Sequence, residues 1–335
     1  MLNQMQILFN LLYTGLGDNG GSLSIIKSAN TLSELGHDVK IVSSGSNYNT
    51  WEKLKVPHVI PTSSGGPFPS ADVVIATGIK SVASTNMFDA KLKLHWIRGW
   101  EIWNRPEKKI VKILKESPTI KIVNSICLQN KLKQFGIDPY VIRPGYDFDD
   151  YFPINIRIPK QVVLGGLYNE GGKRKTKRTQ WIFECYKRLK DKFGQKLSLV
   201  MYGNEGFPSI QEFVFYSNPT IPQKNYVYNT TDIWLVPSEL EGLHIPPAEA
   251  MLTGAVPVTT SAEMSGTQDY ITHNETGIVS ENNLESFIME VEKLVKDPEK
   301  RKRLGEKGRE RILSLGDRTT NMKRLIELLE TLKGE

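Results

Sequence analysis

The stretch "DIWLVPSELEGLHIPPAEAMLTGAVPVTT", residues 232–260, contains a strand, a loop, a short helix and a second strand in one continuous run. The apolar "IWLVP" predicts a buried strand, and "AVPVTT" predicts another. Between them "PPAEAMLTG" predicts a helix that starts with proline and is followed by glycine. Strands joined through a helix lie parallel in one sheet that helices cover on both faces. The stretch therefore predicts an α/β domain of the doubly wound type.

Two glutamates in this stretch, Glu241 and Glu249, are separated by seven residues. The first lies in the loop after the predicted strand and the second on the helix that follows. Gly242 between them allows another group to approach the backbone closely. The free amides and the positive end of the helix dipole favour an anion at the same edge of the sheet. This arrangement suits a pyrophosphate held near two carboxylates that accept hydrogen bonds from sugar hydroxyls.

The rest of the chain repeats the alternation of strand and helix in two runs. The first run begins with "MQILFNLLY" and the second with "QVVLGGL", and the acidic, proline-bearing "YDFDDYFPINIRIPK" between them resembles a linker. We expect a first domain over residues 1–155 and a second over residues 156–317, facing each other across a cleft at the carboxyl ends of their strands. The sequence also permits a final helix over residues 318–335 that crosses back to the first domain.

Composition limits the possible classes of function. The 335 residues are 39% hydrophobic and 24% charged, as in soluble globular proteins, and no apolar run is long enough to span a membrane. The N-terminus lacks the basic and small-residue parts of a signal peptide. Two distant cysteines suit a reducing compartment and argue against a disulfide framework or a zinc site, so we expect a cytoplasmic protein. The net charge of +6 lies mostly in the first half, which leaves peripheral contact with an anionic membrane open.

The segment "PSELEGLHIPPAEAMLTGAVPV" resembles the Glu-x7-Glu signature of retaining glycosyltransferases of family 4, which have the GT-B fold. Other segments resemble that family in the same order along the chain, among them "GGSLSIIKSANTLSELGHDVKIV", "VIRPGYDFDDYFP" and "SGTQDYITHNETGIV". The rhamnosyl- and mannosyltransferase-like members are the most similar. The resemblance implies an α/β GT-B protein with two Rossmann-like domains. It also implies a metal-independent hexosyltransferase (EC 2.4) without a permanently bound cofactor.

The resemblance further implies the substrates. The donor would be a nucleotide-diphosphate sugar linked to UDP, GDP or dTDP, and the acceptor a glycan, a lipid-linked saccharide or a small molecule. No nucleic acid partner is expected. Glu249 would bind the nucleotide ribose, Glu241 would contact the donor sugar, and Lys177 would neutralise the pyrophosphate. The family's arginine position holds Gly166, which is a departure. Further donor-side residues are expected at Lys173, Arg174, Arg178, Gly203, Gly242, Leu243 and His244.

The first domain carries "YTGLGDNGGSLSII", residues 13–26, whose spacing of Gly15, Gly17 and Gly20 also fits a dinucleotide-binding loop. A dinucleotide site needs a carboxylate at the end of the second strand, and "KIVSSGSNYN" has none. We therefore interpret the loop as the family's glycine-rich loop, in which Gly17, Gly20 and Gly21 approach the donor phosphate.

The segment "HWIRGWEIWN", residues 95–104, resembles one that some rhamnosyltransferase-like members write with Gln-Asp-Tyr-Glu. Glu101 matches the glutamate of that pattern, whereas Arg98 departs from it. We expect Arg98 and Glu101 on the acceptor side, and His95 beside Glu241 and Lys177 among the catalytic residues.

Two alternatives stay open at the level of sequence. Another GT-B enzyme, such as a nucleotide-sugar epimerase or a sugar phosphorylase, would share the fold. A basic protein that binds nucleic acid or an anionic surface would use "HWIRGWEIWNRPEKK", where aromatic and basic residues interleave. Salt dependence separates this last class from a transferase, because binding to a phosphate backbone weakens steeply with salt.

Overall fold

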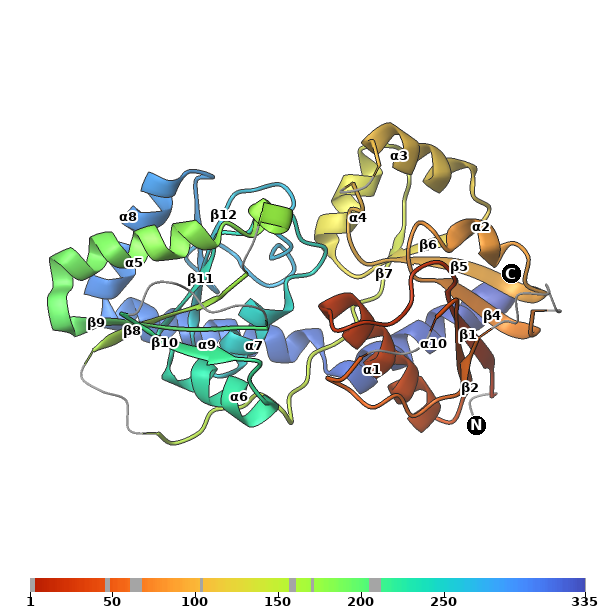
Figure 1. The fold of residues 1–335 in the computed structure, drawn as a ribbon, viewed down its shortest axis with the longest axis horizontal. Coiled ribbons are helices and arrows are strands. Elements are labelled where there is room, and N and C mark those ends of the chain that lie inside the picture. The colour runs from red at the N-terminus through yellow and green to blue at the C-terminus, as the bar shows by residue number, and fades with distance from the viewer. Residues whose placement is uncertain are drawn as a thin grey trace. The chain divides into compact units, whose positions relative to one another are not determined.

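The computed structural model describes residues 4–45, 49–60, 68–102, 105–156, 161–169, 172–204 and 212–334, with only the backbone of residues 172–174. The chain divides into two compact units. Unit 1 comprises Met1–Gly145 together with Arg318–Glu335, and unit 2 comprises Tyr146–Asp317. Each unit is a parallel sheet with helices on its faces (Figure 1), so the predicted α/β class with two doubly wound sheets is confirmed.

Unit 1 contains a parallel sheet in the order β3-β2-β1-β4-β5-β6-β7. The order reverses direction between β1 and β4, and a ligand site in such a sheet lies where the order reverses, outside the carboxyl ends of the strands. The central strands are almost wholly buried and read as continuous apolar runs, as parallel strands with two covered faces must. The seven strands are β1 (Gln6–Leu11), β2 (Asp38–Ser43), β3 (His58–Val59), β4 (Ala71–Ala76), β5 (Ala90–Ile97), β6 (Ile120–Val123) and β7 (Tyr140–Val141).

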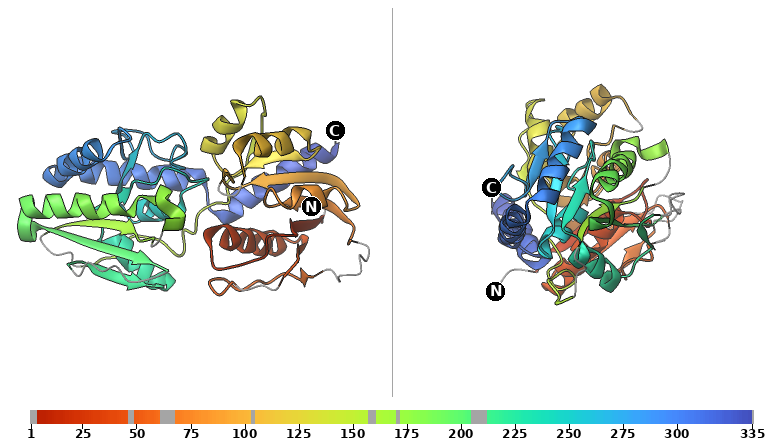
Figure 2. Two further views of the ribbon diagram at one scale, coloured as in Figure 1. Left: turned by 45° about the horizontal axis from the view of Figure 1, so that its top comes forward. Right: turned by 90° about the vertical axis from the view of Figure 1, so that its left-hand side faces the viewer.

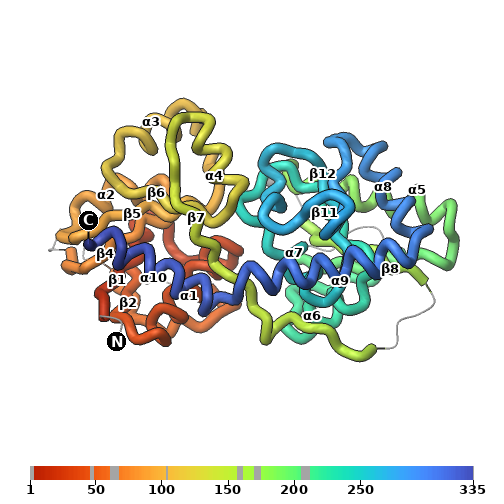
Figure 3. The backbone as a smooth tube through the Cα atoms, turned by 180° about the vertical axis from the view of Figure 1, so that it is seen from behind, coloured from red at the N-terminus to blue at the C-terminus, as the bar shows by residue number. Residues whose placement is uncertain are grey.

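Helices cover both faces of this sheet (Figure 2). One face packs against α1 and α10, which lie side by side (Figure 3), and its core includes Phe9 and Trp96. Met322 and Leu325 of α10 are fully buried there, so the last helix of the chain is part of the core of unit 1. The helices of the unit are α1 (Gly20–Glu34), α2 (Val82–Thr85), α3 (Glu107–Glu116), α4 (Ile126–Lys133) and α10 (Arg318–Gly334).

Unit 2 contains a parallel sheet in the order β10-β9-β8-β11-β12-β13, which reverses direction between β8 and β11. Separate apolar clusters line its two faces. The strands are β8 (Val162–Leu167), β9 (Leu197–Gly203), β10 (Val214–Ser217), β11 (Ile233–Val236), β12 (Val256–Thr260) and β13 (Ile278–Ser280). The helices are η1 (Gly172–Lys177), α5 (Thr179–Phe193), η2 (Gly194–Lys196), α6 (Ile221–Thr230), α7 (Ile245–Leu252), α8 (Leu284–Lys296) and α9 (Pro298–Leu315).

The stretch from residue 232 to 260 forms β11, α7 and β12, as the sequence predicts. Pro246 and Pro247 lie in the first turn of α7, where a missing amide hydrogen costs no helix hydrogen bond. The segment suggested as a linker begins in contact with α6, because the backbone amides of Phe152 and Ile154 donate to Asn225 and Asn229. Among the described residues, none of the helices combines the length and the hydropathy required to cross a membrane.

Candidate active site

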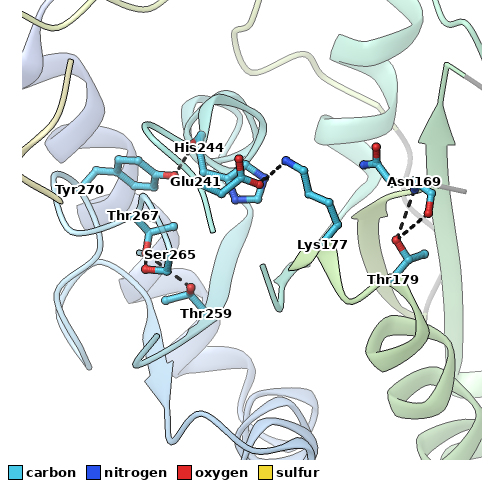
Figure 4. Close-up of polar contacts among 9 residues, drawn as sticks. All are labelled: Asn169, Lys177, Thr179, Glu241, His244, Thr259, Ser265, Thr267 and Tyr270. Atoms are coloured by element: carbon cyan, nitrogen blue, oxygen red, sulfur yellow. Dashed lines mark hydrogen bonds and ion pairs between the residues drawn. The ribbon is translucent and has the colours of Figure 1, made fainter. Parts of the chain in front are cut away.

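Lys177 and Glu241 meet at the carboxyl edge of the sheet of unit 2 (Figure 4). Lys177 ends the short helix η1 that follows β8, and Glu241 lies in the loop that follows β11. These two strands are neighbours at the point where the sheet order reverses. The lysine Nζ donates to Glu241 Oε1, and the side chains are only 19% and 13% exposed. The fold thus brings together two predicted site residues that are 64 positions apart.

Glu241 is ionised in this environment. Burial alone would raise its pKa, but the positive charge of Lys177 and hydrogen bonds from Lys177 and Ser238 outweigh burial, so the pKa lies below the ordinary glutamate value. His244 Nε2 lies 3.6 Å from Glu241 Oε1. Burial lowers the pKa of His244 to about 4, despite the attraction of Glu241, so the imidazole is neutral at pH 7. Lys177 is therefore the positive charge that balances Glu241 at neutral pH.

His244 also begins helix α7. It is the residue immediately before the helix, and its backbone amide donates to the carbonyl of Gly266 over 3.0 Å. Its carbonyl accepts a hydrogen bond from Tyr270 Oη at 2.5 Å (Figure 4). The side chain is buried, and its Nδ1 has no hydrogen-bond partner within the described part of the chain. A polar atom of this kind at the start of a helix is available to a bound ligand.

A second loop, residues 262–267 after β12, supports the loop of Glu241. The amide of Glu241 donates to the carbonyl of Met264 over 2.7 Å. Gly266 has a φ of +71°, and a Cβ at this position would lie 2.6 Å from Glu241 Cβ. No side chain fits there without moving the glutamate. The sequence analysis missed this support, and the only signal for it was the Ser-Gly pair after the predicted strand.

Glu249 is held by a chain of tyrosines. Tyr228 Oη on α6 donates to Glu249 Oε2 at 2.6 Å, and Tyr202 Oη at the end of β9 lies 2.6 Å from Tyr228 Oη. Both tyrosines are buried, and burial, followed by the charge of Glu249, raises the pKa of each phenol, so both keep their protons. Spacing along the chain gave no signal for these two residues, because they come from different elements.

Gly166 and Arg178, two further positions considered for binding the pyrophosphate, have different surroundings in the fold. Gly166 lies in β8, where an added Cβ would meet the Cδ1 atom of Ile182 at 2.8 Å, so this position faces helix α5. Arg178 has a left-handed φ of 51° and pairs with Glu239 at 2.9 Å. Its guanidinium also lies 4.5 Å from the ring centroid of Trp181.

The remaining donor-side positions are Gly203, Gly242 and Leu243, which the structure describes, and Lys173 and Arg174, whose side chains it does not describe. The last residue of β9, Gly203, lies so close to Tyr168 that a Cβ would approach its carbonyl oxygen to 2.8 Å. Gly242 and Leu243 lie in the loop between Glu241 and His244, as their positions in the sequence require. The side chains of Lys173 and Arg174 lie outside the described residues.

In unit 1 the glycine-rich loop connects β1 to α1. The helix begins at Gly20, and the preceding Asn19 caps it by accepting a hydrogen bond from the amide of Ser22 at 2.9 Å. A segment from further along the chain holds the loop, because Asn49 Nδ2 donates to the carbonyl of Gly17 at 2.8 Å. The first amides of α1 therefore end at the carboxyl edge of the sheet, an arrangement that favours anions.

Glu101, Arg98 and His95 have different environments in unit 1. The carboxylate of Glu101 accepts from the amide of Ile79 at 3.2 Å, and burial raises its pKa. Arg98 Nη1 donates to Ser24 Oγ on α1 at 2.7 Å. His95 lies inside strand β5, and burial, aided by the charge of Lys121, lowers its pKa to about 3, so it is neutral. A neutral, fully buried imidazole fits a packing role as well as a catalytic one.

Tyr13 is another residue that the sequence analysis missed. It follows β1 directly, its φ is 71°, and its side chain is 63% exposed. A bulky residue in the left-handed region is uncommon, and such strain is concentrated at functional sites. Nothing in the local sequence pattern distinguishes this tyrosine from a strand residue.

Comparison with known proteins shows which family the sequence around this site resembles. Residues 171–311 match the family model described as glycosyl transferases group 1. The match covers most of unit 2 and includes Lys177, Glu241 and Glu249. Most of unit 2 thus resembles the group 1 glycosyltransferases. The predicted enzyme class, glycosyltransferase, is thereby confirmed. No curated protein matches the sequence of this glycosyltransferase.

Solved structures resemble this glycosyltransferase along nearly its whole length. The glycosyltransferase from Rickettsia africae ESF-5 aligns with a TM-score of 0.75 over 98% of both chains at 18% identity. Anabaena Alr3699/HepE in complex with UDP-glucose aligns with a TM-score of 0.75 over 98% of this chain and 100% of its own at 15% identity. Sucrose-phosphate synthase (tll1590) from Thermosynechococcus elongatus gives 0.73 over 98% and 99% at 14% identity. These likenesses concern the fold, and they confirm the predicted GT-B architecture.

Proposed function

We propose that this glycosyltransferase is a retaining enzyme that uses a nucleotide-diphosphate sugar and does not depend on a metal. The observation that carries the proposal is the buried pair of Lys177 and Glu241 beside the start of α7. The pair combines a cation for the pyrophosphate with an ionised carboxylate for the sugar hydroxyls. The structure of a neighbour with UDP-glucose agrees with a donor of this class.

In the proposed reaction the bond between the anomeric carbon and the diphosphate oxygen breaks. The acceptor hydroxyl oxygen bonds to the same face of that carbon, and its proton passes to the departing phosphate oxygen. Lys177 and the amides at the start of α7 stabilise the charge that develops on the diphosphate. Glu241 orients the donor sugar and stabilises positive charge near the anomeric carbon, without forming a covalent bond.

Glu249 has a separate role in this proposal, which is to bind the ribose of the donor. Tyr228 fixes its carboxylate through a 2.6 Å hydrogen bond, so the carboxylate is oriented before the nucleotide arrives. Unit 1 would bind the acceptor, a glycan, a lipid-linked saccharide or a small molecule. The finer assignment to the rhamnosyl- and mannosyltransferase-like members rests on Glu101 in "HWIRGWEIWN" and is part of the same proposal.

The first test measures thermal stabilisation by UDP, GDP, dTDP and their sugars, with NAD and NADP as controls. A ligand that binds only the folded state raises the melting temperature. We expect one nucleotide family to stabilise the wild type. Glu249→Gln should weaken its binding by about 10- to 100-fold, the value of a hydrogen bond to a charged group. The exposed Glu310 on α9 provides the control Glu310→Gln, which should behave as wild type.

The second test measures transfer of the sugar with the donor found in this way. Lys177→Gln should lower kcat by about 10²- to 10³-fold, the usual effect of removing one group that stabilises developing charge. The exposed Lys187 on α5 provides the control Lys187→Gln. Stabilisation by NAD, or by none of the nucleotide sugars, would contradict the proposal.

A further inference from the structure

Three nitrogen–hydrogen groups lie buried together in unit 1 without an acceptor. They are Trp96 Nε1, Arg98 Nε and Arg98 Nη2, and none has a hydrogen-bond partner in the part of the chain that the structure describes. The Arg98 guanidinium carbon lies 4.2 Å from the centroid of the Trp96 ring. The one hydrogen bond of the guanidinium goes from Nη1 to Ser24 Oγ. The cluster therefore presents several donors and a positive charge in one place.

The charge of Arg98 also has no counterion, since no carboxylate among the described residues forms an ion pair with it. Burial, followed by the repulsion of Arg318 on α10, lowers the pKa of Arg98 to about 9, which leaves the guanidinium charged at pH 7. A buried donor without a partner costs about 1–3 kcal/mol, and more when it is charged. An arrangement this costly is expected where a ligand completes it.

The position of the cluster in the fold is that of a ligand site. Arg98 directly follows the last residue of β5, at the carboxyl edge of the sheet, and Ser24 lies on the helix that follows the glycine-rich loop. The nearby Asn124 Nδ2 donates to the Arg98 carbonyl at 3.3 Å and thereby holds the end of the strand. Asn124 Oδ1 is a buried acceptor without a partner in the described part of the chain, but donors and a positive charge predominate in the cluster. The group that fits them is an oxyanion.

We propose that Arg98 and Trp96 form an oxyanion site in unit 1, which binds a phosphate or carboxylate group carried by the acceptor. The proposal rests on the proposed function in one respect only, namely that unit 1 binds the acceptor. The anionic group receives hydrogen bonds from Arg98 Nε and Nη2 and from the indole of Trp96. Neutral saccharides lack this interaction, so the enzyme selects acceptors that carry a phosphate or a carboxylate.

The test records the indole ¹H–¹⁵N signal of Trp96, assigned with Trp96→Phe, during titration of the full-length protein. The probes are inorganic phosphate, glucose 6-phosphate, glucuronate and neutral glucose. We expect the Trp96 signal to shift with the three anions but not with glucose. Arg98→Gln should weaken this response about 10-fold or more, since charged hydrogen bonds of this kind are worth about 1.5–3 kcal/mol. Arg98→Lys should keep a weaker response.

A second variant separates the two proposed phosphate sites, at Arg98 in unit 1 and at Lys177 in unit 2. Lys177→Gln removes the lysine of unit 2 and should leave the Trp96 response to phosphate unchanged. A glucose 6-phosphate response stronger than that to inorganic phosphate supports a site for the acceptor. A response to inorganic phosphate alone would overturn the assignment to the acceptor. No Trp96 response in wild type would overturn the whole proposal, because buried water would then satisfy these donors.

Failure of this inference and failure of the proposed function give different results. If the Trp96 signal responds to anions but no nucleotide sugar stabilises the protein, the proposed function fails and the oxyanion site stands. If a nucleotide sugar binds through Glu249 but Trp96 is silent, only the oxyanion site fails.

Discussion

The carboxyl edges of the two sheets differ in how their buried positive charge is balanced. In unit 2, Lys177 pairs with Glu241, and a second loop with Gly266 holds the backbone of that glutamate. In unit 1, Arg98 has two buried nitrogens without an acceptor, and the like charge of Arg318 disfavours its own charge. Both edges lie where a doubly wound sheet binds ligands. One edge is thus electrostatically complete before a ligand arrives, and the other is not.

This difference in charge balance implies that the two edges bind their substrates in different ways. A donor entering unit 2 exchanges partners with an existing ion pair, so the positions of the charges are set in advance. A ligand entering unit 1 at Arg98 supplies a partner that is absent, so binding there relieves a cost already present in the free protein. Three substitution experiments test whether the two edges differ in this way.

The largest expected effect is on the free energy of unfolding, when one charged side chain is neutralised at each edge. Glu241→Gln leaves Lys177 largely buried without its counterion and should lower the free energy of unfolding by roughly 3 kcal/mol, which is roughly 6–12 °C for a unit of this size. Arg98→Gln removes a charge that has no counterion and should change stability by about 1 kcal/mol or less. Calorimetry in a buffer without phosphate or sulfate measures both. Equal destabilisation by the two variants would show that the edges do not differ.

The next effect concerns the loop that positions Glu241. Gly266→Ala places a Cβ 2.6 Å from Glu241 Cβ in a backbone with φ of +71°, so it combines a clash with strain. We expect a loss of roughly 2–3 kcal/mol and a clear fall in kcat. Gly254→Ala is the matched control, because Gly254 has a φ of +100° but nothing within 4 Å of its Cβ position. The control should lose only about 1 kcal/mol and keep kcat. A similar kcat for both variants would mean that Gly266 does not position the glutamate.

The smallest effect concerns Glu249. Tyr228→Phe removes the hydroxyl that donates to Glu249 and should weaken nucleotide binding by about 5- to 10-fold, the value of roughly one hydrogen bond. KM for the donor should rise while kcat changes little. Tyr226→Phe on the same helix is the control, since Tyr226 is 46% exposed, and it should match wild type. An unchanged KM in Tyr228→Phe would leave the tyrosine with a packing role only.

The stretch around Glu241 shows how much of the fold follows from local pattern. Apolar runs, two prolines and one glycine were enough to predict β11, α7 and β12, because backbone preferences and the burial of both sheet faces act over a few residues. The enzyme class followed from the same stretch through its resemblance to a family. The alternation of strand and helix was likewise enough to predict two parallel sheets.

Local sequence patterns were thus enough to predict the α/β class, the two sheets and the glutamates of the candidate site. The groups that contact these glutamates became visible only in the folded chain. Lys177 joins Glu241 across 64 residues, Tyr228 reaches Glu249 from another helix, and Gly266 supports the loop of Glu241 from the loop after β12. The tertiary structure also decided that Arg98 is buried without a counterion. The physical reason is that periodicity reports the burial of a single element, whereas charge balance and close packing depend on neighbours that the topology brings from distant parts of the chain.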